Sequence, residues 1–210
     1  MEFYDKGQQN LSVISYLFRQ AGIICPPGGY SEHYHNRARW ETNVEKKLEF
    51  LEKAEEEGLK ALMIAEDSDI PAVIDQMCHY LSKALEAQAS LEPDTYAKEG
   101  LLDKAMKYRE RNIEIEERLF PFNYWRIGVW YNYLALIQME FADVEPDLRD
   151  KRRLLEDAVQ SMEKCLESID KIMPYPGWGN VTGNLAVLRR LQDNYEVILT
   201  RLYEVTNEQG

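Results

Sequence analysis

The chain has few of the residues on which disulfide-linked, zinc-binding and membrane proteins depend. Its 210 residues include only three cysteines and three histidines, and the cysteines form no CxxC pair. An odd number of widely spaced cysteines argues against a disulfide framework or a zinc ribbon and fits a reduced compartment. No apolar run approaches the roughly 18 residues of a membrane span, and the N-terminus lacks the basic-then-apolar order of a signal peptide. We therefore expect a cytoplasmic protein with no membrane partner.

Basic residues are scarce relative to acidic ones. Lysine and arginine number 25 against 37 aspartates and glutamates, which gives a net charge of −12. Binding to a phosphate backbone needs a cationic face that releases counterions, so no nucleic-acid partner is expected. The clusters Lys107–Arg111 and Arg149–Arg153 contain acids as well as bases at helical spacing, which predicts solvated helix faces.

Signatures of common catalytic and cofactor sites are missing. The sequence has no GxxxxGK[ST], no GxSxG, no GxGxxG after a strand and no HExxH. Cys78 and His79 are adjacent in sequence, so they would point to different faces of a helix and would not form a nucleophile–base pair. We predict no catalytic residue and no cofactor.

One segment leaves a metal site open as an alternative. Cys25, His33 and His35 flank a Pro-Pro-Gly-Gly stretch, and thiolate and imidazole are ligands that zinc accepts. No fourth ligand is evident there, and the Glu32-x-x-His35 spacing occurs only once, whereas di-iron bundles need it twice. The main expectation is an ordinary surface loop from Tyr30 to Asn36 with no bound metal.

In place of such motifs the sequence has an internal repeat. The tripeptide that begins at Glu92 returns at Glu145, a shift of 53 residues. An ungapped match between neighbouring segments is typical of a repeat array, in which each unit buries its apolar face against the next unit. At the same offset Tyr80-Leu81 matches Tyr133-Leu134, Ala89 matches Ala142, Leu101-Leu102 matches Leu154-Leu155, and Ala105 matches Ala158.

Apolar residues spaced by three and four, with proline and glycine between the periodic segments, predict an all-α fold without strands. We expect a right-handed superhelical stack of about three antiparallel helix pairs and a C-terminal capping helix, in a single domain over residues 1–210. A closed helical bundle is the alternative. The predicted pairs are 8–66, 68–120 and 121–173, with helices at about 8–24, 39–65, 71–91, 96–120, 122–142 and 146–173, and the capping helix covers about 181–205.

The first pair fits this scheme with a different spacing. Tyr16-Leu17 stands before Leu51 and Ala54 as Tyr80-Leu81 stands before Leu102 and Ala105, but the distance is longer by 13 residues. The Pro-Pro-Gly-Gly loop is therefore predicted to be an insertion.

The third unit resembles the tetratricopeptide repeat. Tyr131, Leu134 and Ala135 match the aromatic, leucine and small residue of that family's first helix, and Ala158 with Met162 stands for the Ala-x-x-x-aromatic pair of its second helix. The unit here has 53 residues rather than about 34, so its helices must be longer. The resemblance implies that the first helix of each pair lines a concave groove, which accepts an extended segment or a helix of a partner protein.

The groove positions of the tetratricopeptide family can be transferred one by one to this sequence, and the resemblance thereby implies a set of groove residues. Several are hydrogen-bond donors, which suit backbone carbonyls or a carboxylate on the partner. The expected function is a non-catalytic protein–protein interaction scaffold, with an all-α enzyme or a small-ligand-binding bundle as the alternative. Uncovered repeat ends also offer a route to homo-oligomers. The predicted groove residues are Arg19, Gln76, His79, Lys83, Asn132, Leu136 and Met139.

Overall fold

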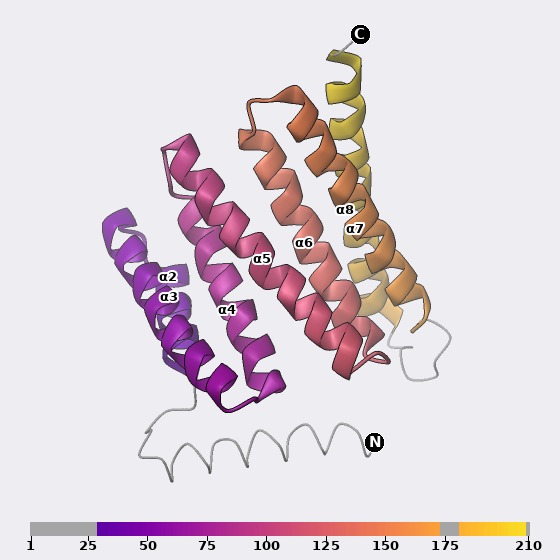
Figure 1. Cartoon of the computed structure of the whole chain (residues 1–210). Helices are drawn as coiled ribbons and strands as arrows, with labels where there is room; N and C mark the ends of the chain where they lie inside the picture. The colour runs from indigo at the N-terminus through magenta and orange to yellow at the C-terminus, as the bar shows by residue number, and fades with distance from the viewer. Residues whose placement is uncertain (1–28, 173–180, 209–210) are drawn as a thin grey trace. The chain divides into compact units, whose positions relative to one another are not determined.

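The protein is entirely helical in the part of the chain that the structure, a computed structural model, describes: residues 29–172 and 181–208 (Figure 1). The all-α prediction is confirmed. No helix in these ranges is both long enough and apolar enough to cross a membrane. The helices are α2 (Gly29–Trp40), α3 (Val44–Asp67), α4 (Pro71–Ala89), α5 (Thr95–Leu119), α6 (Tyr124–Val144), α7 (Leu148–Asp170) and α8 (Val181–Glu208).

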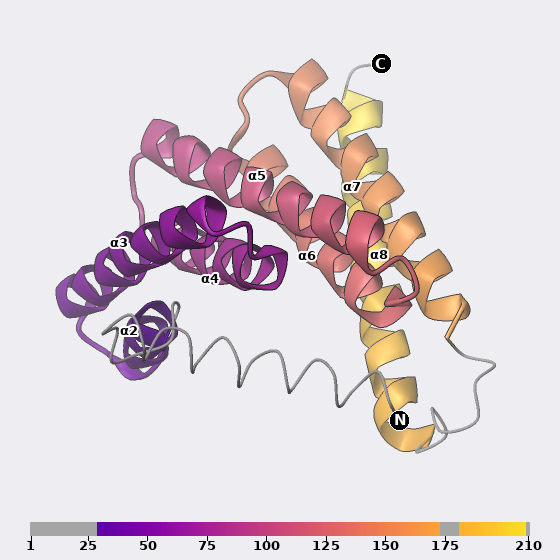
Figure 2. The same ribbon diagram turned by 60° about the horizontal axis from the view of Figure 1, so that its bottom comes forward.

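Helices that follow one another in sequence pack side by side, as expected of a helical-repeat protein. α2 packs on α3, α5 on α6, α6 on α7 and α7 on α8 (Figures 1 and 2). The predicted order of antiparallel helices ending in a terminal helix is therefore confirmed. Backbone contacts divide the chain into two compact units, which meet in sequence between Ala84 and Leu85 inside α4. That the chain is a single domain stays a prediction.

The repeated Glu-Pro-Asp stretch forms the same turn before α5 and before α7. The Glu92 Oε1 atom accepts the Asp94 N–H at 2.9 Å, and Glu145 Oε1 accepts the Asp147 N–H at 2.9 Å. The two aspartates have nearly the same backbone angles, φ −82° and ψ 118° against φ −81° and ψ 119°, and each caps its helix through the side chain. The caps satisfy first-turn N–H groups that have no partner inside the helix.

A third copy of this turn begins α3, 51 residues before the turn at Glu92, and was not predicted. The Glu41 Oε1 atom accepts the Asn43 N–H at 2.9 Å, and Asn43, at φ −78° and ψ 121°, accepts the Lys46 N–H at 2.9 Å. The helix predicted over about 39–65 is therefore confirmed from Val44 onward, but its start is wrong, because this turn separates α2 from α3.

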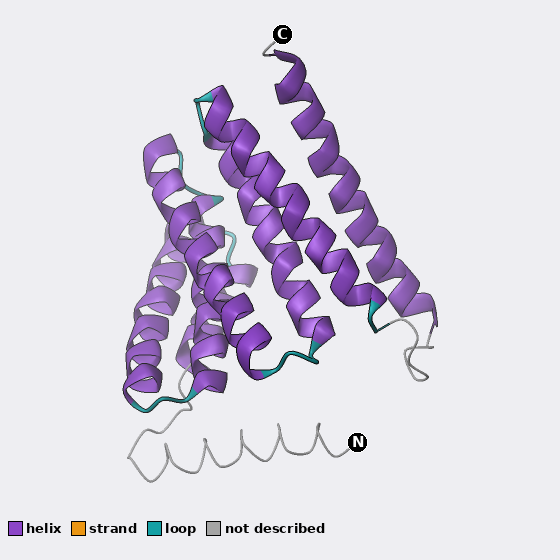
Figure 3. Ribbon diagram, turned by 45° about the vertical axis from the view of Figure 1, so that its right-hand side comes forward, coloured by secondary structure: helices purple, strands orange, loops and turns teal. Residues whose placement is uncertain are grey.

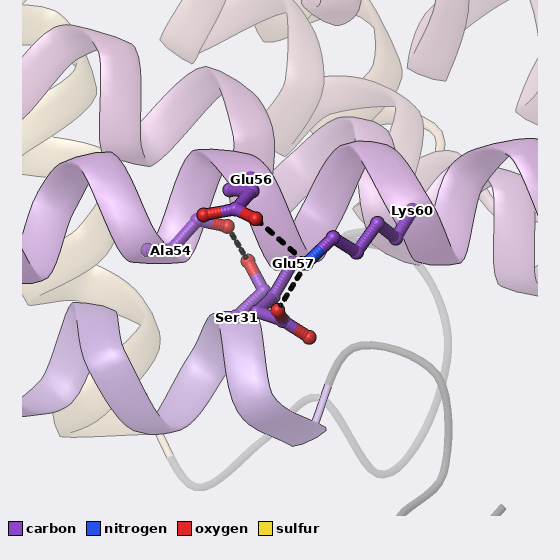
Figure 4. Close-up of polar contacts among 5 residues, drawn as sticks. All are labelled: Ser31, Ala54, Glu56, Glu57 and Lys60. Carbon is purple, nitrogen blue, oxygen red and sulfur yellow. Dashed lines mark hydrogen bonds and ion pairs between the residues drawn. The ribbon is translucent and has the colours of Figure 1, made fainter.

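The helix α2 also corrects two other predictions for the first pair. Residues 30–36 are helical rather than a loop. Ser31, buried in α2, donates its hydroxyl hydrogen to the Ala54 carbonyl of α3 at 2.7 Å (Figure 4). Ala38, Ala89 and Ala142 fall on one position of the repeat at shifts of 51 and 53, and all three are buried. No insertion is needed, since α2 is the partner of α3 in the described residues; the predicted helix 8–24 lies outside them.

The second helices present matching small and apolar residues to the core. The spacing Leu-x-x-Ala recurs in α3, α5 and α7, and its six residues are at most 1% exposed. A buried alanine has a small side chain, which allows a helix to approach its neighbour closely. These residues are Leu51 and Ala54, Leu102 and Ala105, and Leu155 and Ala158.

Candidate partner-binding groove

A hollow of about 480 Å³ lies between α6 and α8, over α7, in the second of the two compact units, which begins at Leu85. α6 and α8 both pack on α7, which contributes the buried side chains of Cys165 and Ile169 to the lining. The neighbouring arrangement of the three helices is visible in Figure 3. The other lining residues are Trp125, Gly128, Val129, Asn132, Tyr133 and Leu136 of α6, and Val187, Arg190, Leu191 and Asn194 of α8.

α6 packs closely on α7 beside the hollow. A Cβ atom at Gly128 would lie 3.2 Å from the Cys165 carbonyl oxygen and 3.1 Å from Ile169 Cδ1, so glycine allows a close approach of the two helices at this point. α8 joins the same core through the buried side chains of Leu191 and Ile198. The hollow therefore lies between α6 and α8, and both of these helices pack on α7.

Two asparagines bridge the groove. Asn194 donates an Nδ2–H to the Oδ1 atom of Asn132 at 3.0 Å, and Asn132 is only 7% exposed. This bond uses one group of each amide. The side-chain NH2 group of Asn132 and the Oδ1 atom of Asn194, which this bond does not use, have the same donor and acceptor types as a peptide bond.

Arg190 is the one charged residue among the described residues that line the hollow. Its side chain is exposed, and it forms no salt bridge with any residue that the structure describes. Arg201, further along α8, is paired with Asp143. The groove therefore has a local positive charge in a protein whose net charge is −12.

Cys165 is among the lining residues and is fully buried. Burial raises the pKa of Cys165 to about 12, and hydrogen bonding with the Asn132 backbone offsets this only in part. The sulfur is therefore a protonated thiol at neutral pH, and it lacks the thiolate that a nucleophile requires.

The predicted groove residues fall into three groups. Asn132 and Leu136 line the hollow, and Met139, further along α6, packs against the core of the second unit. The half-buried residues Gln76, His79 and Lys83 lie on the part of α4 that belongs to the first unit. Arg19 lies outside the described residues.

Sequence reasoning missed the half of the groove that α8 contributes. The repeat has no clear copy in α8, so no position could be transferred to Val187, Arg190 or Asn194. One weak signal was present, since Asn194-Tyr195 repeats the dipeptide Asn132-Tyr133.

A second polar cluster lies between α5 and α6. Arg109 is fully buried, pairs with Glu86 at 3.0 Å, and places its guanidinium 5.3 Å from the centroid of the Trp130 ring. Arg126 lies over the same ring at 5.5 Å and pairs at 2.9 Å with Glu116, which is buried. Such contacts fix the register of two helices and leave little surface for a ligand.

The metal alternative gains no complete ligand set. His33 and His35 both lie on α2, and Cys25 lies outside the described residues. Within residues 29–172 and 181–208, no three or more histidine, cysteine, aspartate or glutamate side chains are grouped so as to hold a metal ion.

Comparisons with known proteins give no family. No protein-family model matches the chain, and no curated protein matches it. Among solved structures the chain is similar to a crystal structure of a de novo designed helical repeat protein, with 15% sequence identity and a TM-score of 0.41. That match covers 85% of this chain and 93% of the designed one.

Proposed function

We propose that the chain is a non-catalytic protein-interaction scaffold of the tetratricopeptide-like kind, and that a segment of a partner protein lies in the groove between α6 and α8. One observation carries the proposal. Val129, Asn132 and Leu136, spaced by three and four on one face of α6, line the same hollow as residues of α8. In the tetratricopeptide family the corresponding face of the first helix is the one that contacts the partner.

The chemistry of the lining supports a peptide as the occupant. Its walls are mainly apolar, and the polar side-chain groups are two amides, one guanidinium, one phenol, one indole N–H and one thiol. Apolar walls take up side chains, while a few placed donors and acceptors fix the orientation of the backbone. The hydrogen-bonding groups of Asn132 and Asn194 match this second role.

A small-ligand site is the second candidate, because the volume of about 480 Å³ falls within the roughly 300–1,000 Å³ typical of small-molecule pockets. The two candidates differ in what raises the melting temperature. A scaffold is expected to respond to peptides and not to a library of small apolar fragments, and the reverse response favours the small-ligand site.

The experiment selects binders from a random twelve-residue peptide library displayed on phage, with the full chain as bait, and titrates the selected peptides by calorimetry. Val129→Trp fills the hollow from α6 and is expected to weaken binding at least about tenfold. Val197→Trp is the matched control, because Val197 is 46% exposed on α8 and does not line the hollow. Melting curves check that both variants fold. Equal binding by wild type and Val129→Trp would move the site to the α4 residues Gln76, His79 and Lys83.

We also propose a cytoplasmic location. Cys78 and Cys165 are free thiols buried in the fold, which suits a reducing compartment. Cell fractionation followed by detection of the tagged chain in each fraction tests this location. Recovery of the chain from an extracellular fraction would contradict it.

A further inference from the structure

The position of Arg190 in the groove indicates the charge of the partner segment. Some other arginines in the second unit are paired with acids of this chain, such as Arg126 with Glu116 and Arg152 with Glu156. Arg190 instead lines the groove and has no such acid among the described residues. Its planar guanidinium can bind a carboxylate through two parallel hydrogen bonds.

The asparagine pair indicates the conformation of the partner. A helix uses its backbone N–H and C=O groups internally, so it would have none to offer to Asn132 and Asn194. An extended segment leaves these groups available. The amides therefore favour an extended chain over a helix.

The lining continues along the groove on both sides of Arg190. Val187 lies one turn before it on α8, and Asn194 lies one turn after it. A bound chain that follows the groove thus passes Arg190 with residues on either side. This suits an acidic side chain inside a segment better than a C-terminal carboxylate.

We infer that the groove selects an extended peptide segment in which an internal aspartate or glutamate pairs with Arg190 and the neighbouring apolar side chains enter the hollow. The inference rests on the proposed function and names its partner class. Trp125, Val129 and Leu191 supply the apolar contacts. The acid supplies selectivity, because an apolar segment without it leaves the guanidinium facing solvent.

The test repeats the peptide selection with three proteins: wild type, Arg190→Glu and Arg189→Glu. Arg189 is exposed on α8 next to Arg190 and does not line the hollow, so its variant makes the same charge change outside the groove. Each selected peptide is synthesised with an acetylated N-terminus in two forms, one with an amidated and one with a free C-terminus, and both forms are titrated at two salt concentrations. Wild type is expected to select one acid flanked by aliphatic or aromatic residues. Arg190→Glu is expected to weaken these peptides at least about tenfold, and Arg189→Glu less than about threefold.

Three outcomes overturn the inference. The first is selection of apolar peptides with no acid preference, which leaves the proposed function intact. The second is equal weakening by both charge reversals, since that points to the net charge rather than to Arg190. The third is loss of binding on C-terminal amidation alone, which assigns the carboxylate to the chain end. Failure of folded wild type to select any peptide counts against the proposed function itself.

Discussion

Arg109 of α5 and Met162 of α7 occupy the same position of the repeat, 53 residues apart, and both side chains are fully buried. Met162 lies in an apolar core, whereas Arg109 lies over the rings of Trp130 and Tyr133 and pairs with Glu86. The repeat therefore keeps the backbone arrangement of two helix pairs while the chemistry inside them differs.

The first prediction follows from this equivalence. Arg109→Met is expected to lower the free energy of unfolding by about 1–2 kcal/mol, because it leaves the Glu86 carboxylate without its Arg109 partner, although the 27% exposure of that side chain lets water solvate the remaining charge. Arg109→Ala also removes the packing of the stem and is expected to cost about 2–4 kcal/mol. Urea unfolding of both variants measures the difference. Similar losses in the two variants would mean that the charge, and not the packing, stabilises this position.

Gly58 gives the second prediction. It falls on the same repeat position in α3, and a Cβ atom there would lie 2.8 Å from Leu81 Cδ2 and 3.1 Å from Ser31 Oγ. Leu81 is fully buried and Ser31 is bound to the Ala54 carbonyl, so neither moves away easily. Overpacking costs about 1–3 kcal/mol, against a gain of about 1 kcal/mol in helix propensity. We expect Gly58→Ala to lower the midpoint of thermal unfolding.

Gly100→Ala is the matched control for Gly58. Gly100 lies in α5, and no atom lies within 4 Å of the position that its Cβ would take. The substitution should raise stability by about 0.5–1 kcal/mol through helix propensity alone. A gain of the same size at Gly58 would refute the close approach of α2, α3 and α4 at that residue.

The sequence predicted the second and third units well because their signals are local. Asp94 and Asp147 follow prolines in matching tripeptides, and the caps they form depend only on the next few residues. In the first unit the stretch is Glu41-Thr42-Asn43, where threonine replaces proline and asparagine replaces aspartate. The turn is the same, but only the glutamate is identical to the residue in the other two copies, so the start of α3 was missed.

The groove was predictable only in part, for a different physical reason. Asn132 and Leu136 were found because α6 carries the repeat. Asn194 contacts Asn132 across 62 residues of sequence, and such a contact depends on how α8 packs against α7 rather than on any local pattern. Arg190 lies in the groove for the same reason.

The third prediction concerns the helix caps. Asp94→Ala and Asp147→Ala should each cost about 1 kcal/mol, because each leaves first-turn N–H groups without an acceptor. Asp94→Asn should cost little, since asparagine caps about as well as aspartate and performs this role at Asn43. Chemical denaturation of the three variants provides the measurement. A large loss in Asp94→Asn would show that the carboxylate charge, rather than its hydrogen bond, supports the helix.

The last prediction concerns alkaline pH. Burial raises the pKa of Cys165 to about 12, whereas an unfolded cysteine titrates near 8.5. Between these values the unfolded chain loses the proton and the folded chain keeps it, so the unfolded state binds fewer protons and stability falls as pH rises. From pH 8.5 to pH 10 the loss from this one group is about 2 kcal/mol.

Cys165→Ala removes the titrating group and should flatten the fall in unfolding free energy between pH 7.5 and pH 10. Ser161→Ala is the control, because Ser161 is a buried neighbour on α7 whose hydroxyl does not titrate in this range. It should shift the stability by the same amount at every pH. Urea unfolding at four pH values distinguishes the two behaviours. A wild-type slope that persists in Cys165→Ala would assign the alkaline loss to another group, such as Tyr131, whose pKa is raised by burial and by its hydrogen bond to Glu117.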